Sequence, residues 1–147
     1  MGLIDTLLRL VRRPAVLQVA MLCTRTGPDG PEVLLVKTLD TGRWIIPKGW
    51  PMAGHTLPEA AAREAWEEAG AVGRVRPQAI GRLSGAKRLK NGIDVPSEIV
   101  VFRMDDVELS DDYPEAGKRK RRFLPVAKAA ARADMADLSE LIRREFA

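Results

Sequence analysis

A loop rich in Pro and Gly, followed by a sharply delimited helix, restricts the fold of this chain more than any other feature. The loop contains Pro47, Gly49, Pro51 and Gly54, residue types that interrupt regular structure. Thr56 then offers an N-cap side chain, Glu59 stands three residues later as in a capping box, and Pro58 falls in the first turn, where proline is tolerated. Gly70 suits the left-handed conformation that ends many helices. The pattern predicts a helix over residues 56–69.

Three glutamates share one face of this predicted helix. At about 100° per residue, Glu64, Glu67 and Glu68 fall within an arc of about 100°, next to an alanine-rich arc. Like charges at these spacings repel one another, so we expect a cation among them. Mg²⁺ fits, because it prefers carboxylate oxygens and leaves part of its shell to water or phosphate. Charge spacing alone also allows a simpler interpretation, a solvated face with Arg63 as an intrahelical partner.

Apolar runs on both sides of this segment predict the remaining elements. We expect strands at 15–24, 32–38, 44–46, 76–83 and 98–104, and helices at 125–133 and 135–146. Gly and Pro between the first two runs indicate a turn that joins two strands. Strands before, between and after helices in one short chain indicate an α/β domain with a mixed sheet covered on both sides.

The length and the composition predict a single domain over residues 1–147. Of its 147 residues, 46% are apolar, which is enough for one core. Residues 1–13 are expected to form a short amphipathic segment, and residues 134–147 a C-terminal helix. No apolar run reaches the roughly 18 residues that a membrane-spanning helix needs, so we expect no membrane partner.

The composition also excludes several chemistries. Cys23 is the only cysteine, which excludes an internal disulfide and suits a reducing compartment, so we predict a cytoplasmic location. His55 is the only histidine, so the common structural zinc sites cannot be built. The sequence lacks the Gly-x-Ser-x-Gly motif that is typical of many acyl-transfer enzymes, so acyl transfer is not expected. The net charge of +4 is typical of many soluble enzymes and makes nucleic acid a poor candidate partner.

The predicted loop and helix together resemble the signature of a known family. The chain reads Gly49-x5-His55-x7-Arg63-Glu64-Ala65-Trp66-Glu67-Glu68-Ala69-Gly70-Ala71. This is similar to the Nudix box, G-x5-E-x7-R-E-U-x-E-E-x-G-U, where U is aliphatic. Residues 43–50 and 113–123 resemble, in addition, the subgroup of diphosphoinositol polyphosphate and diadenosine polyphosphate hydrolases. The resemblance implies a single-domain Nudix-type α/β/α sandwich that acts as a pyrophosphohydrolase on acid anhydrides of phosphorus.

His55 stands where the box has its first glutamate. The resemblance implies that this glutamate mainly braces the loop and pairs with the box arginine, here Arg63, so its loss need not abolish activity. Glu59, four residues before Arg63, is in position to take over the pairing. His55 itself fits a plain loop position and a position facing the substrate about equally well.

The resemblance also implies roles for the matching residues. The implied metal ligands, for Mg²⁺ or Mn²⁺, are Glu64, Glu68, Glu67 and the backbone carbonyls of Lys48 and Gly49. Glu64 and Glu67 are the implied catalytic residues together with Arg63, which would orient the carboxylates. The resemblance leaves open which glutamate acts as the base, and it gives Glu67 two alternative roles, as the base or as a ligand of a second ion. Glu98 is a weaker candidate for a further ligand or base.

The expected substrate is a phosphorylated small molecule that contains a diphosphate linkage. Candidates are a diadenosine polyphosphate, a diphosphoinositol polyphosphate or another nucleoside-diphosphate derivative. The basic residues expected nearest to the site are Arg43, Lys48, Lys87 and Arg88, which suit phosphate groups. Trp50 can either stack on a base or pack in the core.

Two alternatives keep the same fold. One is a pyrophosphohydrolase for the 5′ end of RNA, which would use residues 118–122 as a basic rail. The other is a nucleotide-binding regulator without hydrolysis. We expect either a monomer or a homodimer.

Overall fold

The computed structural model describes residues 2–4 and 16–147. Its strands are β1 (Val16–Gly27), β2 (Gly30–Lys37), β3 (Trp44–Ile45), β4 (Lys48–Gly49), β5 (Ala71–Val75), β6 (Gly81–Arg88), β7 (Asp94–Leu109) and β8 (Arg121–Pro125). Its helices are α2 (Leu57–Ala69), α3 (Val126–Arg132) and α4 (Ala136–Glu145). The predicted amphipathic segment at 1–13 lies outside the described residues, apart from 2–4.

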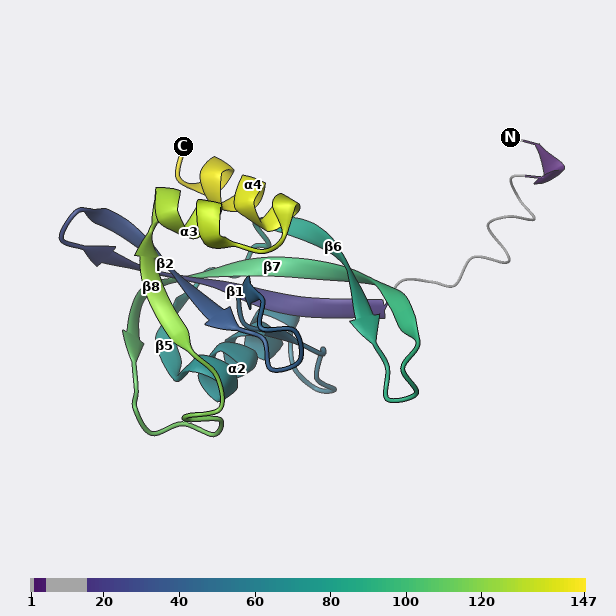
Figure 1. The fold of residues 1–147 in the computed structure, drawn as a ribbon, viewed down its shortest axis with the longest axis horizontal. Helices are drawn as coiled ribbons and strands as arrows, with labels where there is room; N and C mark the ends of the chain where they lie inside the picture. The colour runs from purple at the N-terminus through teal and green to yellow at the C-terminus, as the bar shows by residue number, and fades with distance from the viewer. Residues whose placement is uncertain (1, 5–15) are drawn as a thin grey trace.

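In the described part of the chain, eight strands form one mixed sheet. β1 runs antiparallel to β2 on one side and parallel to β7 on the other. β3 and β8 pair with β2, β4 pairs with β1, and both β5 and β6 pair with β7. Figure 1 shows α2 on one face of the sheet and α3 and α4 on the other. This arrangement confirms the predicted α/β fold, with a mixed sheet covered on both sides.

Both faces of the sheet bury apolar side chains. Successive side chains of a strand point to opposite faces. In β1, Ala20 and Leu22 pack on the side of α3 and α4, whereas Val19, Met21 and Cys23 pack on the side of α2. A strand buried on both faces tends to be a near-continuous apolar run, which explains the apolar stretch of β1 from Val19 to Cys23.

Helix α2 begins and ends as its sequence predicts. The Thr56 side chain accepts a hydrogen bond from the Glu59 backbone N at 3.3 Å, and the Glu59 carboxylate accepts one from the Thr56 backbone N at 3.1 Å. Gly70 ends the helix with a φ of 65°. The alanine face of α2, formed by Ala60, Ala61, Ala65 and Ala69, is buried against the sheet. The glutamates next to that face therefore lie close to the strand ends.

The strand predicted at 76–83 is wrong over its first half. β5 ends at Val75 and β6 begins at Gly81, with residues 76–80 outside any strand. Pro77 cannot donate to a ladder. The flanking N–H groups of Arg76 and Ile80 still donate to carbonyls of β7, at 2.9 and 2.8 Å. The strand predicted at 98–104 is the middle of the longer β7.

Three strands are absent from the sequence-based prediction: the two-residue β4, which lies in the segment expected to be a loop, and the longer β5 and β8. β5 follows directly after the Gly70 cap, and β8 begins with two arginines. Neither has the alternating or continuous apolar pattern that marks a strand, because each pairs at the border of the sheet. The helices expected at 125–133 and 135–146 correspond to α3 and α4. No helix within residues 2–4 and 16–147 is long and apolar enough to cross a membrane.

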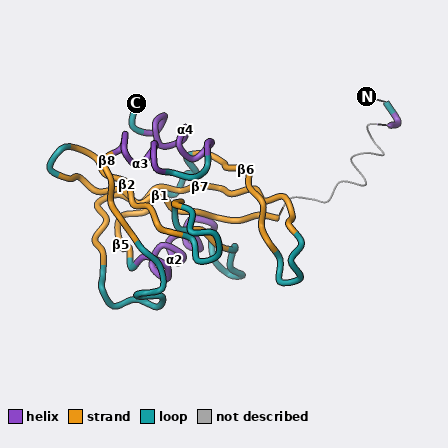
Figure 2. Tube along the Cα trace, viewed as in Figure 1, coloured by secondary structure: helices purple, strands orange, loops and turns teal. Residues whose placement is uncertain are grey.

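The loop between β7 and β8, residues 110–120, runs beside α2 (Figure 2). Its Ser110 N–H donates to the carbonyl of Gly70 at 2.8 Å, and its Glu115 N–H to the carbonyl of Glu67 at 3.0 Å. The loop is thereby tied to the C-terminal half of the helix. This contact brings residues far apart in the sequence to the edge of the glutamate face.

Candidate active site

Glu64 and Glu68 line the same cavity, of about 340 Å³, between α2 and the loop that precedes it. Lys48 and Gly49, the two residues of β4, line it as well. β4 is held in place by its antiparallel pairing with Val19 and Ala20 of β1. The Lys48 N–H donates to the Glu68 carboxylate at 3.3 Å. The strand and the helix therefore meet at the two carboxylates.

Gly49 allows this close approach. A Cβ atom at position 49 would overlap the Glu64 carboxylate, so only glycine leaves the carboxylate in its present place. This requirement has a purely steric origin, since Gly49 does not have a positive φ.

Burial and mutual repulsion make both carboxylates hard to ionise. Burial raises the pKa of Glu64 to about 7, with further repulsion from Glu67 and Glu115. Burial likewise raises the pKa of Glu68 to about 8, against the favourable charge of Arg119 and with added repulsion from Glu64. A positive charge placed between the two carboxylates would stabilise their ionised forms.

Glu67 does not line this cavity. Its carboxylate accepts a hydrogen bond from Arg63 Nε at 2.8 Å, one turn earlier on the exposed side of α2. The expected pairing of Arg63 with Glu59 is therefore replaced by a pair with Glu67. Glu59 instead completes the capping box and lies 3.6 Å from Nδ1 of His55. The three glutamates share an arc of the helix, but two of them face the cavity.

The predicted phosphate-binding residues gather beside the carboxylates. Lys48 and Lys87 line both the carboxylate cavity and a neighbouring cavity of about 360 Å³, which Arg43 and Arg88 also line. Burial and the charge of Lys87 lower the pKa of Lys48. An anion between the two lysines would relieve that repulsion. The structure thus brings all four basic residues to one continuous region.

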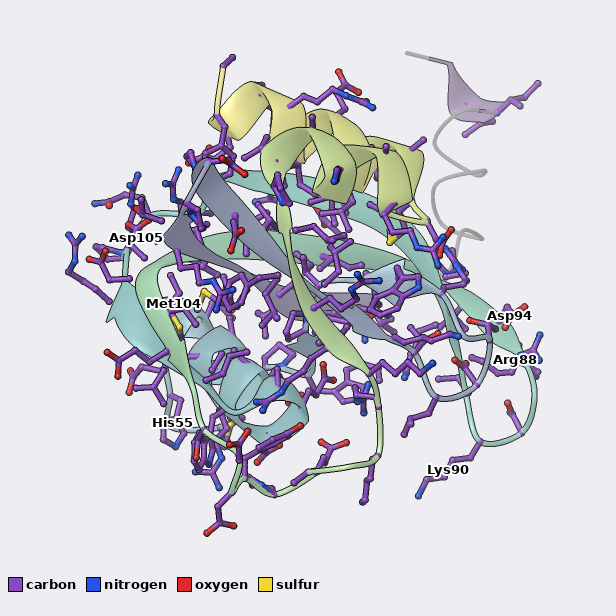
Figure 3. The ribbon with its side chains drawn as sticks, turned by 60° about the vertical axis from the view of Figure 1, so that its left-hand side comes forward. His55, Arg88, Lys90, Asp94, Met104 and Asp105 are labelled. Atoms are coloured by element: carbon purple, nitrogen blue, oxygen red, sulfur yellow. The ribbon has the colours of Figure 1, made fainter. Side chains whose placement is uncertain are left out.

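Two of these four cations already have protein partners. Arg88 pairs with Asp94 through Nε at 3.1 Å, across the hairpin of β6 and β7, and Figure 3 shows the two side chains together, well apart from His55. Arg43 donates to the carbonyl of Asp134 at 3.1 Å. Among the described residues, Lys48 and Lys87 have no ion pair with a carboxylate, which leaves them as the more available pair for phosphate.

The NUDIX domain family model matches residues 16–144 of this chain. The chain belongs to the NUDIX domain family. This assignment confirms the family that the residues from Gly49 to Ala71 indicate, although His55 replaces the first glutamate of the box.

Two curated relatives of this NUDIX chain are hydrolases by name. Nudix hydrolase 12, mitochondrial, of Arabidopsis thaliana is 33% identical over 101 residues, which are 67% of this chain and 50% of the relative. Diphosphoinositol polyphosphate phosphohydrolase 3-alpha of Mus musculus is 29% identical over 114 residues, 76% of this chain and 65% of the relative. The chain thus spans about half the length of the first relative and 65% of the second.

A solved structure supports the fold of the NUDIX domain. The C. elegans Ap4A hydrolase superposes with a TM-score of 0.61 at 20% identity, covering 90% of this chain and 97% of that chain. At this level of identity the likeness establishes the shared fold.

The sequence does not reveal Arg119 as part of the site of this NUDIX domain. Arg119 lines the carboxylate cavity, and its guanidinium lies 3.8 Å from the Glu68 carboxylate and 2.7 Å from that of Glu115. The spacing of Glu115 and Arg119 by four residues is visible in the sequence. Their contact with Glu68 depends on the loop beside α2 and has no signal in the sequence.

The basic run at 118–122 does not form a continuous rail. Arg119 turns into the carboxylate cavity, and Arg121 donates to the carbonyls of Ala69 and Ser110 at 2.6 and 2.7 Å. Glu98, the weaker candidate ligand, forms a close ion pair with Arg82 on the neighbouring strand and does not line either cavity at the site.

The donor set fits a hard divalent cation that shares its shell with a substrate. Among the described residues, no three His, Cys, Asp or Glu side chains are grouped so as to enclose a metal ion. Mg²⁺ is commonly bound through one or two carboxylates, with substrate phosphates and water supplying the other ligands. Glu64 and Glu68 match that requirement, because their pKa values stay raised even with Arg119 beside Glu68.

Proposed function

We propose that this chain hydrolyses a diphosphate linkage in a phosphorylated small molecule, with Glu64 and Glu68 holding Mg²⁺ or Mn²⁺. The observation that carries the proposal is that these two carboxylates line one cavity together with Lys48 and Lys87. Carboxylates suit a hard cation, and ammonium groups suit phosphate oxygens. One cavity therefore offers complementary partners for both parts of a metal–diphosphate.

The chain's own residues would mainly bind and orient. A bound divalent cation would neutralise charge on the phosphoryl oxygens and lower the pKa of a water molecule. Lys48 and Lys87 would hold phosphate oxygens, with Arg43 and Arg88 farther along the same region. Arg119 would fix the direction of the Glu68 carboxylate, to which it is adjacent. Such positioning and electrostatic stabilisation account for most of the rate in phosphoryl transfer.

The general base stays a choice between two residues. Glu64 lies in the cavity, and a bound cation would keep its carboxylate ionised and able to accept a proton from water. Glu67 is held by Arg63 outside the cavity and would have to turn inward to reach a water molecule there. The geometry therefore favours Glu64 as the base.

Two exposed apolar side chains favour a nucleotide among the candidate substrates. Trp50 and Leu39 line the carboxylate cavity and are 44% and 60% exposed. The Lys87 ammonium lies 5.9 Å from the centroid of the Trp50 ring. A flat base can lie on Trp50 while its phosphates reach Lys87. An inositol polyphosphate has no flat apolar part for that surface, so we propose a nucleoside-diphosphate derivative, with diadenosine polyphosphate as the first compound to test.

Glutamine substitutions at the carboxylates test the proposal. In Mg²⁺-dependent hydrolysis of diadenosine polyphosphate, Glu64→Gln and Glu68→Gln should each lower turnover at least ~100-fold, comparable with loss of a key electrostatic group in other enzymes. The matched control is Glu140→Gln, the same change at an exposed residue of α4 away from both cavities.

Two outcomes would contradict this assignment. One is undiminished Mg²⁺-dependent hydrolysis in both cavity variants. The other is a rise in melting temperature on adding the substrate with no product formed, which would identify a nucleotide-binding regulator instead.

We further propose a cytoplasmic location, supported by the buried and unpaired Cys23.

A further inference from the structure

A third cavity lies on the opposite face of the sheet from α2. Its volume is about 490 Å³, larger than either cavity at the candidate active site. It is lined by Trp44, Arg122, Leu124, Lys128, Ala131 and Arg132. It shares no lining residue with the other two cavities, and its size falls in the range usual for small-molecule sites.

Regular geometry brings these side chains together. Arg122 and Leu124 are two residues apart on β8 and so point to the same face of the sheet, the face covered by α3 and α4. Lys128 and Arg132 are four residues apart on α3 and so lie on one face of that helix. The strand row and the helix row form two walls of the cavity, which Trp44 of β3 also lines.

The walls carry three positive charges and no negative one. Within the described residues, neither Arg122, Lys128 nor Arg132 forms an ion pair with a carboxylate, whereas the exposed Arg74 and Arg88 each pair with an aspartate. Like charges four residues apart also destabilise a helix. An anion in the cavity would relieve this repulsion. No Asp or Glu lines this cavity. It can therefore bind an anion directly, whereas the cavity lined by Glu64 and Glu68 would need a metal ion between its carboxylates and an anion.

The floor of the cavity is apolar and partly aromatic. Trp44 is 6% exposed, and the Arg132 guanidinium lies 5.7 Å from the centroid of its ring. Leu124 and Ala131 extend the apolar surface. The indole N–H of Trp44 is buried and has no acceptor among the described residues. A ligand that matches this cavity combines an anionic group with a flat apolar part.

We propose that this cavity is a second binding site, separate from the active site, for a phosphate monoester carried on a flat ring, such as a nucleoside monophosphate. The phosphate would lie among Arg122, Lys128 and Arg132, where two guanidinium forks and one ammonium group can donate to its oxygens. The ring would lie against Leu124 and Trp44. The site does not depend on hydrolysis at the carboxylate cavity.

Indole signals of the intact protein can test this proposal with AMP as the probe. Trp44 borders the second site and Trp50 the active-site cavity, so their indole N–H resonances report on the two places separately. Each is assigned through its Trp→Phe variant. We expect AMP, titrated in the presence of EDTA, to shift the Trp44 resonance in a saturable manner.

A charge-neutralising double variant and a matched control define the site. K128A/R132A replaces two exposed residues and should weaken AMP binding, followed at Trp44, at least ~10-fold, as expected for the loss of charge-assisted contacts. K90A/R143A removes the same net charge from exposed positions elsewhere, Lys90 being at the tip of the hairpin of β6 and β7 (Figure 3), and should bind AMP like the wild type. Circular dichroism checks that both variants are folded.

Separate ligands test the two parts of the probe. Adenosine and inorganic phosphate should each bind at least ~10-fold more weakly than AMP, because each lacks one of the two contacts. The proposal is overturned if AMP shifts the Trp50 resonance alone, if K128A/R132A binds AMP as tightly as the wild type, or if inorganic phosphate binds as tightly as AMP. It is equally overturned if single-stranded RNA binds at Trp44 with affinity that rises with length, which would indicate a polyanion surface. Because EDTA is present, none of these results depends on the proposed hydrolysis.

Discussion

Raising the pH should destabilise the metal-free protein, because Glu68 is a buried carboxyl group that resists ionisation. Burial is the main cause that raises its pKa from 4.5 to about 8. The unfolded chain loses this proton near pH 4.5, and the folded protein near pH 8. Between these values the folded state binds more protons than the unfolded state. The free energy of unfolding therefore falls as the pH rises through this window.

The size of the effect follows from the two pKa values. Within the window, each pH unit costs about 1.4 kcal/mol for one such group. Between pH 5.5 and 7.5, Glu68 alone should lower the free energy of unfolding by about 2.5 kcal/mol. For a domain of this size that is a fall of roughly 5–10 °C in Tm. Glu64 adds to the fall, by a smaller amount because its carboxylate is better solvated.

Other carboxylates do not mask this slope. Hydrogen bonds from Thr41 and Arg88 lower the pKa values of Asp40 and Asp94, respectively. Both aspartates are ionised in the folded and the unfolded chain above pH 5.5. Their proton binding is therefore the same in both states between pH 5.5 and 7.5, and they do not change the slope.

Urea and thermal denaturation in EDTA at pH 5.5 and 7.5 provide the measurement. Glu68→Gln cannot ionise and should lose most of the pH dependence. Mg²⁺ at about 100 times its Kd should restore about 2.7 kcal/mol to the wild type, and more Mg²⁺ should be needed at pH 5.5, where protons compete for the carboxylates. The reasoning is refuted if the metal-free wild type is as stable at pH 7.5 as at 5.5, or if Glu68→Gln keeps the full pH dependence.

Two further predictions concern the active-site cavity. Gly49→Ala should lower turnover at least ~100-fold, because the added Cβ displaces the Glu64 carboxylate. Steady-state kinetics with Mg²⁺ titration measure this loss. Partial rescue by a second substitution, Glu64→Asp, would show that the overlap is the cause. Trp50→Ala should raise the KM for diadenosine polyphosphate about 10-fold, in line with the loss of one stacked base. The same substitution should leave the KM for a diphosphoinositol polyphosphate unchanged. Equal effects on both substrates would remove the argument for a nucleotide.

Local interactions made helix α2 predictable from the sequence. Thr56, Glu59 and Gly70 act on backbone groups within a few residues of themselves, so the sequence alone predicts where the helix begins and ends. The spacing of Glu64 and Glu68 puts their side chains one turn apart wherever the helix lies. The apolar runs of β1 and β2 are predictable for the same reason, because a continuous apolar stretch is a property of neighbouring residues in the sequence.

Contacts between distant parts of the chain decided the rest. The sequence places Glu67 with its two neighbours, but burial against β4 selects Glu64 and Glu68 for the cavity and leaves Glu67 to Arg63. Arg119 reaches Glu68 because the loop from β7 to β8 is tied to α2. Similarly, β5 and β8 exist as strands because β7 and β2 offer them a partner.

The electrostatic character of the site belongs to the tertiary structure as well. In the sequence, Glu68 is one of four acidic residues on a helix that water can fully solvate. Packing α2 against the sheet removes much of that water and places Glu64 nearby, and this raises the pKa of Glu68 to about 8. The sequence by itself determined which chemical groups are available and how they are spaced along each element. Only the folded chain determined which of them lose their water and face one another, because desolvation and long-range contacts arise when separate elements pack.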